Sequence, residues 1–72
     1  MSYLTDAVHA IEEKEGAAFY TIEHTENVQP TNSLEAAEYA ERLYKKQNRY
    51  SGAFHSVAQK EGTEWRVMVM EE

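Results

Sequence analysis

The sequence predicts one small α+β domain over residues 1–72, with its elements in the order α-β-α-β-β. A chain of 72 residues is long enough for a single hydrophobic core. Apolar residues recur at helical spacing in two segments and alternate along the chain in three others. We therefore expect a three-stranded sheet that ends in a C-terminal β-hairpin and packs on a central helix.

The first element is predicted to be a helix from about Ser2 to Glu15. Its apolar residues have the i, i+3, i+4, i+7 spacing of an amphipathic helix, and they are Leu4, Ala7, Val8 and Ile11. Gly16 follows at the position where a left-handed residue commonly ends a helix.

A strand is predicted next, between Ala17 and Val28. The segment is rich in aromatic and β-branched residues, and Ala18, Tyr20 and Ile22 recur at a two-residue period. Pro30 ends the strand, because proline has no amide hydrogen to donate to a neighbouring strand.

The second helix is predicted to begin at Asn32, since Asn32 and Glu35 have the spacing of a capping box. In that motif the Asn32 side chain accepts from the Glu35 amide, and Glu35 reaches back to the Asn32 amide. The helix should end near Arg49 or Tyr50, with Gly52 beyond its end. A stripe of mostly small residues suits close packing on a sheet, and it contains Ala36, Ala37, Ala40, Leu43, Tyr44 and Gln47.

The last two elements are predicted to be strands at 54–59 and 65–70, joined as a β-hairpin. The turn between them contains Gly62, which can take a positive φ. The sequence leaves the pairing of the first strand open. It lies either parallel beside 54–59 through a right-handed crossover or antiparallel beside 65–70.

Composition limits the class of partner. Thirteen acidic residues against seven basic ones give a net charge of −6, which disfavours nucleic acid and anionic membranes as direct partners. The bases at 45–49 are interpreted as charges that complement the end of the second helix. The first residues lack the features of a signal peptide, and no apolar run approaches the roughly 20 residues that span a bilayer. We expect a cytoplasmic protein.

Residues for catalysis are scarce. The absence of cysteine excludes disulfides, thiolate metal sites and a cysteine nucleophile. The sequence contains no glycine-rich phosphate loop and no serine-nucleophile signature. His9, His24 and His55 could bind a metal only by converging in space, and exposed histidines are the simpler interpretation. We expect no enzymatic activity, no metal and no cofactor.

The acidic residues are the most informative feature. They form either a solubilising surface or a negative face that imitates the charge lattice of DNA and fits a basic groove. Glu35, Glu38 and Glu41 climb the second predicted helix at three-residue steps and span about 9 Å. In the second case, the chain would be a small inhibitor or adaptor that blocks a basic, nucleic-acid-binding surface of a protein complex. The predicted partner-binding residues are Glu35, Glu38, Glu41, Glu12, Glu13 and Glu15.

A second hypothesis uses aromatic residues. Tyr20, Tyr44 and Trp65 would then form the surface of a small ligand-binding or structural module. If one sheet face lacks a helix, Met68 and Met70 would extend an apolar patch, and a C₂ homodimer through the sheet would follow. Binding that is insensitive to salt would favour this hypothesis, whereas acidic docking should weaken as salt rises.

Several of these segments resemble known families. The stretch 19–69 contains Phe-Tyr-x-Ile, then Glu-Ala-Ala-Glu-x-Ala-Glu-Arg-Leu at 35–43, then Trp-Arg-Val at 65–67. It resembles the first β-α-β-β half of a SPOR peptidoglycan-binding domain, which implies glycan binding. The whole chain resembles the small acidic inhibitors of bacteriophages, including some anti-CRISPR proteins, in size, charge, element order and a helix introduced by Ser33-Leu34. That resemblance implies a protein that docks on a host defence or nucleic-acid-handling complex and blocks it.

Overall fold

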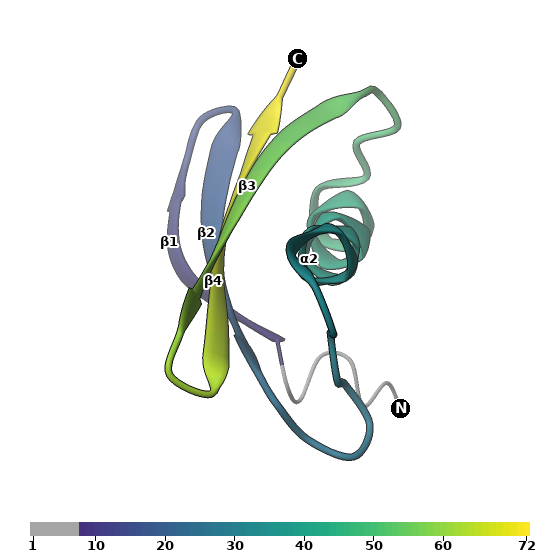
Figure 1. The fold of residues 1–72 in the computed structure, drawn as a ribbon. Coiled ribbons are helices and arrows are strands. Elements are labelled where there is room, and N and C mark those ends of the chain that lie inside the picture. The colour runs from purple at the N-terminus through teal and green to yellow at the C-terminus, as the bar shows by residue number, and fades with distance from the viewer. Residues whose placement is uncertain (1–7) are drawn as a thin grey trace.

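The computed structural model describes residues 8–72, and for residues 9–14 it describes the backbone. Four strands and one helix make up this part of the chain, namely β1 (Val8–Lys14), β2 (Ala17–Glu23), α2 (Ser33–Asn48), β3 (Phe54–Glu61) and β4 (Glu64–Glu71). The strands form one antiparallel sheet in the order β1-β2-β4-β3, and α2 lies against one of its faces (Figure 1). The predicted α+β class and the C-terminal hairpin packed on a helix are confirmed.

The pairing of β2 resolves the alternative that the sequence left open. β2 lies between β1 and β4 and pairs antiparallel with both. The β3–β4 hairpin turns through two residues, Gly62 and Thr63, and Gly62 has a φ of 63° at the first of them. Glycine takes such an angle without the steric cost that a side chain would impose.

The predicted helix from Ser2 to Glu15 is wrong for the described residues, and its part within 1–7 lies outside them. Val8–Lys14 is β1, which turns into β2 through Glu15 and Gly16, with a φ of 75° at Gly16. The pairing register shifts between Ala10 and Glu12, so one extra residue interrupts the two-residue period of the strand. Because this bulge hides the strand pattern, the helical spacing of Val8 and Ile11 was misleading within the described residues. The sheet therefore has four strands instead of three.

β2 is shorter than the predicted strand and ends at Glu23. A turn closes behind it, in which the Thr25 amide donates to the Val28 carbonyl at 2.9 Å and the Val28 amide donates to Thr25 Oγ1 at 3.1 Å. This turn folds Val28 back into the core, where its side chain is buried. The chain thereby leaves the sheet and crosses to the start of α2.

The ends of α2 lie where its capping residues place them. Asn32 Oδ1 accepts from the Glu35 amide at 2.9 Å, as predicted. Glu35 Oε1 reaches back one residue further than expected and accepts from the Thr31 amide at 2.9 Å and from Thr31 Oγ1 at 3.1 Å. At the other end Arg49 adopts a left-handed conformation with φ 53°, so the helix ends at Asn48.

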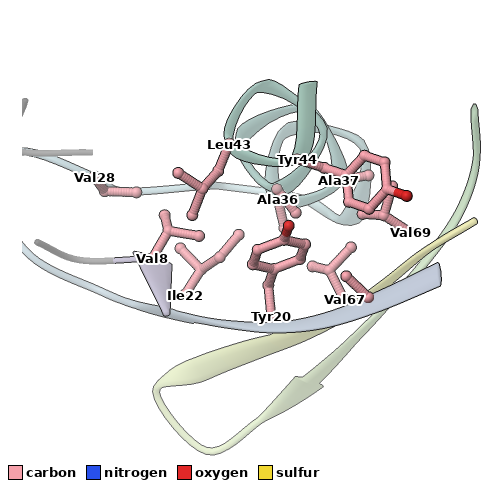
Figure 2. Packing of buried hydrophobic residues seen from close by; sticks show 12 residues of the cluster. Val8, Tyr20, Ile22, Val28, Ala36, Ala37, Leu43, Tyr44, Val67 and Val69 are labelled. Atoms are coloured by element: carbon pink, nitrogen blue, oxygen red, sulfur yellow. The ribbon is translucent and has the colours of Figure 1, made fainter. Parts of the chain in front are cut away.

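The core fills the layer between α2 and the sheet (Figure 2). Alanines on α2 allow the helix to approach the sheet closely, and Tyr20 points up from β2 between them and Val67. Tyr44 closes one end of the layer, and its hydroxyl donates to Glu71 Oε2 at 2.6 Å. The buried residues are Val8, Ala18, Tyr20, Ile22, Val28, Ala36, Ala37, Ala40, Leu43, Tyr44, Val67 and Val69.

Candidate protein-binding surfaces

The three helix glutamates differ in what they contact. Glu35 is committed to the helix start through its bonds to Thr31. Glu41 accepts a hydrogen bond from the Ser56 hydroxyl on β3 and so ties the helix to the sheet. Glu38 is exposed. Of the three, Glu38 is therefore the glutamate that can contact a partner without breaking such a hydrogen bond to Thr31 or Ser56.

The surface around these glutamates carries both signs of charge. α2 holds three glutamates and three bases, so the helix has no net charge and the −6 of the chain lies outside it. Arg42 lies over the Tyr39 ring at 5.6 Å and lines a shallow hollow together with Glu35 and Glu38. Six residues at about 100° each also set Glu35 and Glu41 about 120° apart around the helix axis. The helix thus presents a mixed surface to any partner.

The other predicted acids lie on the first hairpin. Glu12 and Glu13 belong to β1, at the edge of the sheet, and are described by their backbone positions. Glu15 is exposed in the turn that follows. This turn lies beside the end of β4, because the Glu71 amide donates to the Gly16 carbonyl at 2.9 Å. These acids and the helix glutamates therefore come from different elements.

The predicted aromatic surface is wrong. Tyr20 has an exposed fraction of 0% and Tyr44 of 4%, so both are core residues. Trp65 pairs with Ile22 across the sheet, and because Ile22 is buried under α2, Trp65 lies on the covered face as well. The two-residue period of Ala18, Tyr20 and Ile22, from which the strand was predicted, marks the side of the sheet that packs on the helix.

A row of three glutamates on neighbouring strands is an acidic feature that sequence analysis missed. Glu23 on β2 pairs with Glu64 on β4, and Glu64 pairs with Glu61 on β3. We call Glu23, Glu64 and Glu61 the acidic row. Glu61 and Glu64 lay between the predicted strands 54–59 and 65–70, and they pair because the observed turn is only Gly62 and Thr63. The addition of Glu23, 38 residues before Glu61, requires the order of the strands.

The acidic row forms one end of the sheet face that is turned away from α2, which we call the open face. Three further rows cross β2, β4 and β3 in register. The second contains Thr21, Arg66 and Gln59, the third contains Phe19, Met68 and Val57, and the fourth contains Ala17, Met70 and His55. A hollow of about 330 Å³ lies on this face, and Phe19, Val57, Arg66 and Met68 are among the residues that line it.

Arg66 is the base closest in register to the acidic row. Its Nη1 lies 3.8 Å from Glu61 Oε2, and both side chains are about half exposed. An exposed pair at this distance contributes about 0–1 kcal/mol. This ion pair therefore offsets only part of the repulsion between Glu61 and Glu64.

Among the residues whose side chains the structure describes, Val8 and 15–72, no group of three or more histidine, aspartate or glutamate side chains has the geometry of a metal site. His24 and His55 are exposed on separate elements. The helix found in this part of the chain is neither long enough nor apolar enough to cross a membrane. Comparisons with protein-family models, with curated proteins and with solved structures found no match to this chain.

Proposed function

We propose that this chain is a non-enzymatic binding protein, an inhibitor or adaptor that occupies a basic, nucleic-acid-binding surface of a protein complex, such as a host defence complex. The observation that best supports this function is the acidic row. Its three carboxylates come from three neighbouring strands and lie at one end of the sheet. The strands set the spacing of the three backbone positions at about 5 Å from one to the next, so the row concentrates three negative charges at a fixed place in the fold.

The acidic row costs the isolated fold free energy. Like charges directly opposite one another on adjacent strands destabilise a sheet by about 0.2–1 kcal/mol for each pair. A basic partner would replace this repulsion with attraction, which also accelerates encounter at low salt. Residues that oppose stability in the free protein and favour association with a cationic surface are typical of a binding site.

Affinity capture from a lysate tests this proposal, using the tagged protein and washes at about 50 mM and then 500 mM NaCl. The Debye length falls from about 13 Å to about 4 Å over this range, so a docking driven by charge should be released in the second wash. The E61K/E64K variant should lose the captured protein. Mass spectrometry of each eluate identifies the partner, and an added DNA duplex should displace it if the occupied surface binds nucleic acid.

The matched control is E26K/E72K, which makes the same change in net charge at two exposed glutamates outside the acidic row. It should retain most of the captured protein. A partner that stays bound at 500 mM NaCl, or that both variants lose equally, would contradict docking through the acidic row.

The helix glutamates are tested separately with E38K. Glu38 is the exposed member of that set, so its charge can be reversed without removing a hydrogen bond described above. If α2 takes part in docking, E38K should weaken capture about tenfold at low salt, while the circular dichroism spectrum stays unchanged. Unaltered capture would restrict the contact to the sheet.

A further inference from the structure

The open face carries apolar residues that no described helix or loop covers. Val57 has an exposed fraction of 45%, and Phe19, Met68 and Met70 are half-buried on the same face. Among the side chains described outside 9–14, the most exposed large apolar residues are Val57 and Leu34, and Leu34 lies on α2 with an exposed fraction of 68%. The sheet is therefore packed on one side and apolar at the centre of the other.

We propose that the open face is the contact between two copies of this chain, stacked as a C₂ dimer with their strands antiparallel. The third row, Phe19, Met68 and Val57, lies on the two-fold axis in this arrangement, so apolar residues meet apolar residues at the centre. The second row of each copy then faces the fourth row of its partner. This gives an apolar centre and a more polar rim, which is the usual anatomy of a protein interface.

The charges select this orientation. If the strands were stacked parallel, the acidic row of one copy would lie on the acidic row of the other, and six carboxylates would face each other. In the antiparallel arrangement the two acidic rows project beyond opposite ends of the contact. Within the overlapping rows of β2, β4 and β3, Arg66 carries the single full charge, and at the sheet edge β1 adds Glu12 in register with Phe19 and Lys14 in register with Ala17. The centre of the contact therefore avoids the acidic row.

The area matches a weak dimer. Three rows about 6.8 Å apart on four strands about 4.8 Å apart cover roughly 20 by 19 Å. Two such faces bury on the order of 800 Å² as flat rectangles and somewhat more once the relief of the side chains is included, which is below the roughly 1,200 Å² of stable interfaces and within the range of weak, transient ones. Interfaces of this size are weak, so we expect a dissociation constant on the order of 10 µM or higher.

Sedimentation equilibrium between about 1 and 300 µM protein measures this association. The mass should rise from 8.3 kDa toward twice that value. V57E should lower the association constant at least tenfold, while L34E, the matched change on α2, should leave it within twofold. Salt should strengthen the dimer or leave it unchanged, because it screens the repulsion between two chains of charge −6. The acidic docking proposed above has the opposite salt dependence, so each proposal can fail without the other.

Crosslinking tests the orientation and does not depend on the folding of V57E. The chain has no cysteine, so V57C and Q59C each introduce a single thiol. Face-to-face sheets lie about 10 Å apart, so a short bis-maleimide should couple V57C to its own copy. The two Gln59 positions lie about 14 Å apart along the strands in addition to this gap, so Q59C should couple poorly. A wild-type chain that stays monomeric at 300 µM, or stronger coupling by Q59C, would overturn the proposal.

Discussion

Single residues determine the packing of the loop between α2 and β3, and Gly52 is the clearest case. The Tyr50 ring lies over Gly52, so that a Cβ added there would be 2.6 Å from Tyr50 Cζ. The single Tyr50 hydroxyl proton is shared between the carbonyls of Ala53 at 3.3 Å and Glu72 at 3.2 Å. The ring also packs on Phe54, with 5.2 Å between centroids. The glycine thus makes room for a tyrosine that joins the loop to the C-terminus.

G52A should lower the free energy of unfolding by about 1–2 kcal/mol, because the added methyl group displaces the Tyr50 ring from these contacts. Urea denaturation measures the change. The control is S51A, at the exposed neighbouring position, which should change it by less than about 0.5 kcal/mol. In a Y50A background the cost of G52A should vanish, and an equal cost there would mean that the steric explanation is incorrect.

The elements that sequence analysis predicted correctly are those whose signals are local. The start of α2 depends on Asn32 and Glu35, and the β3–β4 hairpin depends on alternation and Gly62, all within a few residues. β1 is different, because an edge strand with a bulge is stabilised by its pairing with β2 and less by its own pattern. The local apolar spacing therefore pointed to a helix that tertiary pairing does not permit.

The cap of α2 should be measurable as a unit of stability. N32A removes the acceptor of the Glu35 amide and should cost about 1 kcal/mol, which corresponds to a fall in Tm of about 4–8 °C for a domain of this size. The control N27A, in the preceding loop, should leave Tm nearly unchanged, because Asn27 contributes its backbone amide to the turn. A loss in N27A equal to that in N32A would argue against the capping bond as the cause.

At the scale of the whole molecule, the position of charge could be only partly predicted. The sequence shows an excess of acid and places three glutamates on one helix, but that helix proves neutral, and Glu35 and Glu41 serve the fold. The acidic row depends on the register of three strands. The burial of the aromatic residues depends on which face of the sheet the helix covers. Both are properties of the tertiary structure, and the spacing of residues along the sequence does not predict them.

The acidic row should also oppose stability in the free protein, and this separates its role in binding from a role in folding. E64Q removes the charge that pairs with both Glu23 and Glu61, so it should raise the free energy of unfolding by several tenths of a kcal/mol at about 20 mM NaCl. At 1 M salt the Debye length is about 3 Å, so most of this gain should disappear.

Denaturation at about 1 µM protein avoids any contribution from dimerisation. The control E26Q, an exposed loop glutamate, should show a smaller gain. If E64Q instead lowered the free energy of unfolding, Glu64 would stabilise the sheet, and this result would contradict the proposal that the acidic row is a binding site that opposes folding.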